Sequence, residues 1–226
     1  MRPIKLRKAF ALCSLLLLCT LLFEGRFARA DIRLIAPGIS VAEAYFSGSD
    51  APMTLQIAKS DPLIMGKYLL YMIRQNKISD LRQQINQRIK TDNNPYVYML
   101  DGMLHDYEGK HFLAQASYFR GLQLNPNNLS IRNFLAISYY LGGREDGAIK
   151  TLERLQRLDA SGVQESKTLA MIYALSNNDA AATEMLDSLY GGSRTGELLL
   201  KYKELRQIPN SGHKTIAIFN LQLQKT

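Results

Sequence analysis

Residues 129–162, LSIRNFLAISYYLGGREDGAIKTLERLQRLDASG, carry the clearest structural pattern in this sequence. Apolar and small residues recur at helical spacing on both sides of the pair Gly142-Gly143: Leu135, Ala136, Tyr139, Ala148, Leu152 and Leu155. Apolar residues three or four positions apart predict an amphipathic helix, and paired glycines predict a turn. The stretch therefore predicts two helices joined by a short turn.

The same pattern recurs 34 residues away on either side, with no insertion across residues 95–196. In this register, small residues fall on small residues: Gly102, Ala136 and Ala170 form one set, and Ala114, Ala148 and Ala182 another. A small side chain at a crossing point allows two helix axes to approach closely. Each hairpin alone exposes an apolar face, which the next hairpin covers. We therefore expect three stacked hairpins, at residues 95–128, 129–162 and 163–196.

This arrangement resembles the tetratricopeptide repeat, a helix–turn–helix unit of the same length. The matching residues are Gly102, Ala114, Tyr118, Gly121 and Pro126 in the first unit, Leu135, Ala136, Tyr139, Ala148 and Leu152 in the second, and Leu169, Ala170, Tyr173, Ala182 and Leu186 in the third. No Trp opens a unit, and Asp101 replaces the leucine found later at Leu135 and Leu169. The resemblance covers about half of the chain beyond residue 30. It implies an all-α solenoid whose first helices line a concave face.

The flanking segments predict caps for the solenoid. Residues 61–94 begin with Asp61-Pro62, a typical helix start, and are expected to form a degenerate repeat or an N-terminal capping hairpin. A capping helix is predicted over residues 195–206, and residues 197–226 are assigned to this helix and a C-terminal tail. Within the tail, residues 215–224 (TIAIFNLQLQ) are rich in β-forming residues, so we expect either a short β-strand or a mobile tail.

Residues 1–30 have the pattern of an export signal. Four basic residues precede an apolar run over residues 9–23, and the segment ends in Ala28-Arg29-Ala30, a small-x-small cleavage pattern. An apolar run of 15 residues is shorter than the roughly 20 that span a bilayer. We therefore expect a cleaved signal peptide and a periplasmic protein without a stable membrane span, and the alternative is an uncleaved inner-membrane anchor. Residues 31–60 are expected to form an extended or linker segment.

The signal also explains much of the charge and all of the cysteines. The net charge is +8, but residues 1–30 hold six basic residues against Glu24, which leaves 22 basic and 19 acidic residues. No nucleic-acid partner is therefore expected. Both cysteines, Cys13 and Cys19, lie within the signal, so the mature chain can form no disulfide and no cysteine metal site.

The sequence contains no catalytic motif, and we expect neither an enzyme, a cofactor nor a metal. Three histidines occur, His105, His111 and His213, but their spacing matches no zinc site. His105 occupies the repeat position of Tyr139 and Tyr173, which favours a packing role. The glycine pairs are typical of turns and match no phosphate-binding loop.

The resemblance places a partner-binding groove on the concave face. The predicted groove residues are Tyr96, Met99, Met103, Tyr107, Asn133, Ile137, Tyr140, Lys167 and Met171. Methionine and tyrosine favour an apolar helix or peptide, and the polar set that clamps a terminal carboxylate is missing. The expected function is a scaffold that binds another envelope protein and assists complex assembly or secretion. The groove filled by the chain itself, a structural subunit of a larger complex, and a recruiter of a cell-wall or polysaccharide enzyme are the alternatives; the oligomeric state is open.

Overall fold

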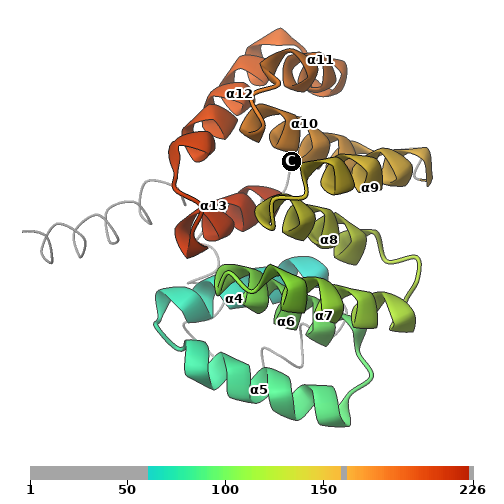
Figure 1. Ribbon diagram of the computed structural model, residues 1–226, viewed down its shortest axis with the longest axis vertical. Helices are drawn as coiled ribbons and strands as arrows, with labels where there is room; N and C mark the ends of the chain where they lie inside the picture. The colour runs from blue at the N-terminus through green and yellow to red at the C-terminus, as the bar shows by residue number, and fades with distance from the viewer. Residues whose placement is uncertain (1–60, 159–161, 224–226) are drawn as a thin grey trace, which may run out of the picture. The chain divides into compact units, whose positions relative to one another are not determined.

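The computed structural model describes residues 61–158 and 162–223, which form ten α-helices and no β-strand (Figure 1). The helices are α4 (Pro62–Arg74), α5 (Ile78–Thr91), α6 (Pro95–Tyr107), α7 (His111–Leu124), α8 (Leu129–Leu141), α9 (Glu145–Leu158), α10 (Val163–Leu175), α11 (Asp179–Tyr190), α12 (Gly192–Gln207) and α13 (Gly212–Gln222). The described chain is thus an all-α solenoid of packed helix hairpins. The expected signal peptide (1–30) and extended segment (31–60) lie outside the described residues.

Helix starts follow the sequence period closely. The first helices of the three central hairpins begin at Pro95, Leu129 and Val163, and each start lies 34 residues after the previous one. Asparagine side chains fix two of these starts, because Asn94 accepts a hydrogen bond from the backbone N–H of Tyr96 and Asn128 accepts one from that of Ile131, both at 2.9 Å. A side-chain acceptor here satisfies a backbone donor that has no partner within the helix.

One turn geometry recurs in all four hairpins from α4 to α11. A residue with positive φ follows the first helix of each hairpin: Asn76, Gly109, Gly143 and Asn177. The next residue donates its N–H to the carbonyl five positions earlier, as Arg144 does to Tyr139 at 2.8 Å. This is a Schellman motif, which ends a helix by closing its last turn. The α4–α5 hairpin therefore shares the turn of the three hairpins that follow it.

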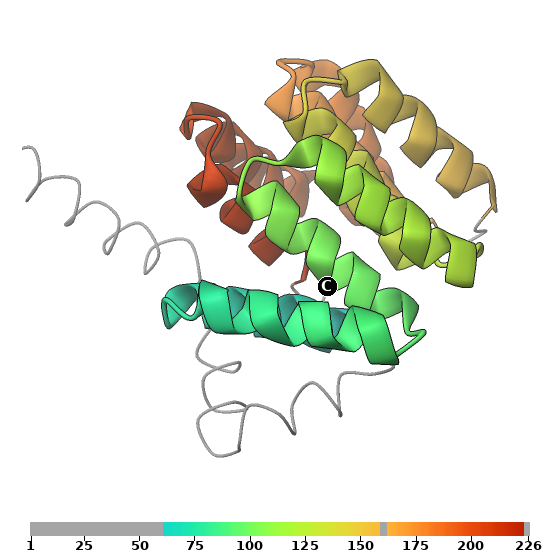
Figure 2. The same cartoon turned by 60° about the horizontal axis from the view of Figure 1, so that its bottom comes forward.

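The first helices of the hairpins (α4, α6, α8 and α10, hereafter the inner helices) form a row in which each contacts the next (Figures 1 and 2). The second helices pack on this row, so that α7 contacts α6 and α8, and α9 contacts α8 and α10. The small residues that define the repeat are fully buried at these crossings: Ala114, Ala136, Ala148, Ala170 and Ala182. Close approach between helices thus depends on those side chains.

Gly102 lies at a crossing that leaves no room for a side chain. A Cβ atom added there would lie 2.6 Å from the ring of Tyr118, which is itself fully buried. We expect Gly102→Ala to lower the free energy of unfolding by about 1–3 kcal/mol, because a rigid ring must shift within a packed core. Urea unfolding followed by circular dichroism measures this change. Gly196→Ala is the matched control, because nothing lies within 4 Å of a Cβ there; equal effects of the two variants would contradict the close packing.

The structure corrects the prediction for the C-terminal segment. Residues 215–222 belong to helix α13, so neither the short β-strand nor the mobile tail is right for them. Local β-propensity is outweighed because a helix buries residues on several sides of this segment at once, including Thr215, Ile218 and Phe219. The capping helix, predicted over 195–206, begins earlier: α12 spans Gly192–Gln207 and starts inside the predicted third unit.

Candidate functional site

The predicted groove residues lie on the inner helices α6, α8 and α10, and most are inaccessible. Met99, Met103, Ile137 and Met171 are fully buried. Asn133 and Lys167 are also buried, and the three tyrosines of the set are half-buried: Tyr96, Tyr107 and Tyr140. The expectation of an open apolar groove along this face is therefore wrong.

Helix α13 covers this face. Its Phe219 ring packs edge-on against Phe134 of α8, with ring centroids 5.4 Å apart and an interplanar angle of 84°. At the start of α13, a Cβ on Gly212 would lie 2.9 Å from the ring of Tyr107, so the backbone approaches α6 closely. Contacts with α4 and α6 complete the packing. The inner helices thus bind a helix, and that helix is the chain's own.

Polar contacts hold the end of α13 against α10. Lys167 donates from Nζ to the carbonyl of Leu221 at 3.3 Å, and Gln222 donates from Nε2 to the sulfur of Met171 at 3.5 Å. Burial lowers the pKa of Lys167, and the nearby charges of Arg194 and Lys201 act in the same direction. A cation at the C-terminal end of a helix is electrostatically favourable. These contacts make α13 part of the folded core.

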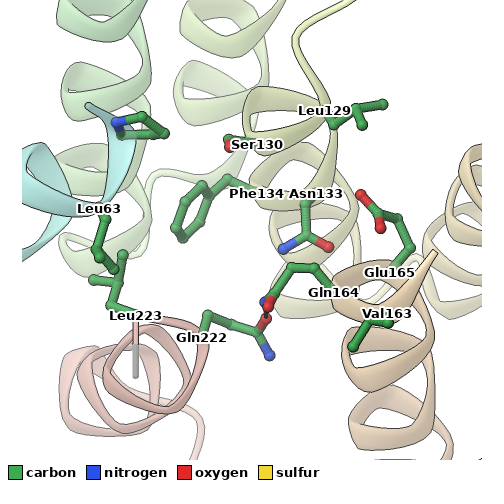
Figure 3. A pocket seen from close by; sticks show the side chains of 11 residues that line it. Leu63, Leu129, Ser130, Asn133, Phe134, Val163, Gln164, Glu165, Gln222 and Leu223 are labelled. Atoms are coloured by element: carbon green, nitrogen blue, oxygen red, sulfur yellow. Dashed lines mark hydrogen bonds between the residues drawn. The ribbon is translucent and has the colours of Figure 1, made fainter. Parts of the chain in front are cut away.

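A pocket of about 420 Å³ remains open beside the C-terminal end of α13 (Figure 3). It is lined by Pro62, Leu63, Leu129, Ser130, Asn133, Phe134, Val163, Gln164, Glu165, Gln222 and Leu223. These residues come from the first two turns of α4, α8 and α10 and from the end of α13. Its volume falls in the range of about 300–1,000 Å³ that is common for ligand sites.

Asn133 is the polar residue in this pocket that the protein leaves unsatisfied. Its side chain is only 3% exposed, and Oδ1 is buried without a hydrogen-bond partner. Figure 3 shows the amide directed into the pocket, near the Gln164 and Gln222 side chains. Those two amides already have partners, since Gln222 Oε1 accepts hydrogen bonds from Gln164 Nε2 at 2.6 Å and from the Thr168 hydroxyl at 2.8 Å. A buried acceptor without a partner costs about 1–3 kcal/mol, so a hydrogen bond from a ligand to Asn133 Oδ1 would contribute most to the free energy of binding.

Positive and negative groups both surround the pocket. Three helix N-termini face it, and each carries a partial positive charge. The α10 end has no side-chain cap, because Gly162 precedes it. Glu165, which is 3% exposed, adds a carboxyl group in the first turn of α10. A ligand with strong net charge of either sign is therefore not favoured over a neutral polar one.

Sequence reasoning found Asn133 but missed most of the pocket. Ser130 and Gln164 occupy one position of the repeat in successive units, and Leu129 and Val163 occupy another, so the period itself could have identified them. Nothing in the sequence indicated that Gln222 and Leu223 would complete the site.

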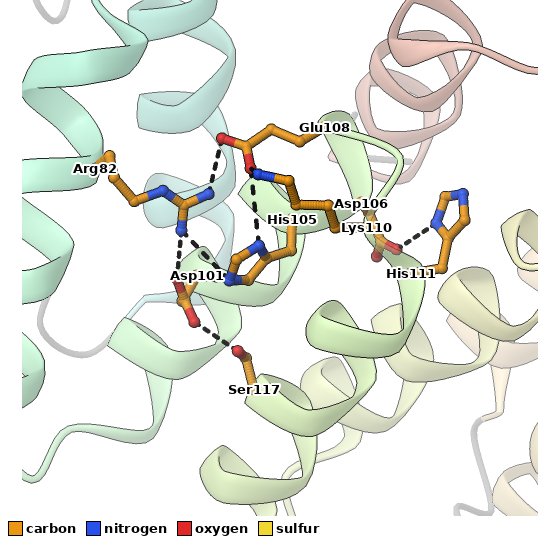
Figure 4. Close-up of polar contacts among 8 residues, drawn as sticks. All are labelled: Arg82, Asp101, His105, Asp106, Glu108, Lys110, His111 and Ser117. Carbon is orange, nitrogen blue, oxygen red and sulfur yellow. Dashed lines mark hydrogen bonds and ion pairs between the residues drawn. The ribbon is translucent and has the colours of Figure 1, made fainter.

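His105 and His111 belong to polar clusters between helices (Figure 4). Asp101 accepts hydrogen bonds from Arg82 at 2.8 Å and from the Ser117 hydroxyl at 2.5 Å, while His105 Nε2 lies 3.6 Å from the same carboxylate. Glu108 pairs with Arg82 at 2.9 Å. Burial lowers the pKa of His105, and the charge of Asp101 opposes this effect. The cluster ties α5 to α6 and α7.

Asp106 forms a second cluster in the core. Its carboxylate, 1% exposed at the residue level, accepts hydrogen bonds from Ser138 at 2.7 Å and Tyr118 at 3.0 Å, and lies 2.9 Å from His111 Nδ1. Burial raises the pKa of Asp106, and these three contacts act in the opposite direction. Ser138 donates to the carboxylate, so the arrangement joins α6, α7 and α8.

Within the described ranges, no group of three or more His, Cys, Asp and Glu residues is placed to hold a metal ion. The helices of the same ranges include none with the length and apolarity of a membrane span. The chain matches no known protein family, no curated protein and no solved structure in the comparisons made with it.

Proposed function

We propose that this chain is an exported, non-enzymatic helical-repeat scaffold that binds an extended segment of a partner protein in the Asn133 pocket. The unpartnered, buried Oδ1 atom of Asn133 is the observation that carries the proposal. The proposed location is the periplasm, on the basis of the signal-like pattern in residues 1–30.

An extended peptide suits the chemistry of this pocket. A peptide group offers an N–H donor for Asn133 Oδ1 and a carbonyl for the amide nitrogen, so one asparagine can pair with both. Leu63, Phe134 and Leu223 supply apolar walls for a side chain of the same peptide. The carboxyl group of Glu165 disfavours a terminal carboxylate, which agrees with the absence of a carboxylate-clamping set in the sequence.

The test combines site-specific crosslinking with one substitution. A photo-crosslinking amino acid at Val163, which is 40% exposed at the mouth of the pocket, should capture a partner in the cell. The captured segment, mapped by mass spectrometry and made as a peptide, should bind the purified chain in fluorescence anisotropy. We expect Asn133→Leu to weaken that peptide by about tenfold, because the peptide N–H loses its acceptor.

The same substitution distinguishes binding from folding. Since Asn133 Oδ1 has no partner within the protein, Asn133→Leu should leave the unfolding midpoint unchanged or raise it. Leu200, exposed on α12, is the control position for the crosslinker. Unchanged peptide affinity in Asn133→Leu, or a clear loss of stability, would refute a binding role for this asparagine.

A further inference from the structure

Helix α7 presents an apolar surface that no described residue covers. Phe112 is 82% exposed, Leu113 52%, Phe119 49% and Leu124 41%. These four residues, hereafter the α7 patch, are most of the large exposed hydrophobic residues in the described chain. The other side of α7 is buried through Ala114, Tyr118 and Gly121. A helix that is apolar on both sides normally has something packed against each side.

The charges beside the α7 patch are positive. Helix α7 contains no Asp or Glu, and its Arg120 is exposed. The Arg144 guanidinium lies 5.6 Å from the centroid of the Phe112 ring. The nearby Glu108 is already paired with Arg82 and with Lys110, each at 2.9 Å. The surface is therefore apolar, with the cations Arg120 and Arg144 beside it.

Helix α9, which packs on α8 as α7 does, also exposes more positive than negative side chains. Three of its exposed residues are cations at helical spacing, Lys150, Arg154 and Arg157. Its exposed acidic residues, Glu145 and Asp146, are confined to the first turn. Cations thus outnumber anions on the exposed parts of the two helices together.

We propose that the α7 patch docks on a bilayer that contains anionic phospholipids. The phenyl rings of Phe112 and Phe119 enter the interfacial region, and Arg120 and Arg144 lie at the headgroup phosphates. Charge disfavours a second copy of the chain, because two α7 helices would bring like charges together and α7 itself contains no acid to compensate them. A bilayer also accommodates protruding side chains such as Phe112 without a preformed pocket. None of the pocket residues belongs to α7, so this surface is separate from the proposed peptide site.

The experiment reports on the patch itself in the full chain. Cys13 and Cys19, the only cysteines, are replaced by serine, and an environment-sensitive fluorophore is attached through Ala116→Cys, an exposed position between Leu113 and Phe119. Vesicles of phosphatidylcholine with about 30% phosphatidylglycerol should shift the emission to shorter wavelength, as the anionic component attracts the arginines. The same label at Leu200→Cys on α12, 59% exposed, should not respond.

Variants separate apolar insertion from charge. The double substitution Phe112→Ser with Phe119→Ser should raise the lipid concentration that gives half of the emission change at position 116 by at least about tenfold. Arg120→Gln should raise the same concentration by about fivefold. Leu200→Ser, the matched control, should leave it unchanged. Circular dichroism of each variant confirms the fold. Because the label is local, binding of residues 1–30 to the same vesicles does not mimic the result.

Three outcomes would overturn the proposal. They are no emission change at position 116 with anionic vesicles, an equal change with phosphatidylcholine alone, and a change that grows with protein concentration in the absence of lipid. The last of these would indicate a second copy of the chain on the α7 patch.

Discussion

Replacing Asp106 with alanine is expected to lower the free energy of unfolding by about 3–5 kcal/mol. The carboxylate is buried and accepts hydrogen bonds from Ser138 and Tyr118 while contacting His111, so its removal strands polar groups from two further helices in the core. Each stranded group costs about 1–3 kcal/mol. Urea unfolding at neutral pH, followed by far-ultraviolet circular dichroism, measures the loss.

Asp187→Ala provides the comparison for this prediction. Asp187 is exposed on α11, and substitutions at such positions change stability by about 0.5 kcal/mol or less. If Asp106→Ala lowered the free energy of unfolding by less than about 1 kcal/mol, the Asp106 cluster would contribute little to stability and the prediction would be wrong.

The second large effect concerns α13. Phe219→Ala should cost about 3–5 kcal/mol, because the ring is fully buried and its removal leaves a cavity beside Phe134. Since α13 contacts α4, α6 and α12, the loss should appear in one cooperative transition of the whole described unit. Hydrogen exchange should show reduced protection of α6 and α8 as well as of α13.

His213→Ala, on the exposed side of the same helix, is the matched control and should be nearly neutral. If Phe219→Ala released α13 alone and left the unfolding midpoint of the other helices unchanged, α13 would be a detachable element. The inner helices could then offer the open apolar groove that the sequence suggested.

The helix hairpins could be predicted because their determinants are local and periodic. Small residues such as Ala136 and Ala148 are required wherever helices cross, and a left-handed residue is required after each first helix. Gly109 and Gly143 indicate that turn in the sequence, whereas Asn76 and Asn177 adopt the same positive φ without being glycines. The α4–α5 hairpin was harder to recognise as a member of the series because it also lacks the small crossing residues, since Tyr68 and Asp80 stand 34 residues before Gly102 and Ala114.

The occupant of the inner face could not be predicted in the same way. Whether residues 215–222 form a strand or a helix depends on what they pack against, and that surface is formed by residues on distant helices, such as Phe134 and Lys167. Local preference carries no information about such a contact. The pocket was missed for the same reason, since Leu223 and Gln222 reach it only through the fold.

The order of the helices along the chain has a consequence for biosynthesis. Because α13 follows every other described helix, the hairpins emerge before the helix that contacts Phe134 and Met171 in the folded chain. During that interval the nascent chain exposes these apolar side chains, which favours contact with a chaperone or with another nascent chain. The core is complete only after α13 has emerged, so the rate of chain synthesis determines how long these side chains stay exposed.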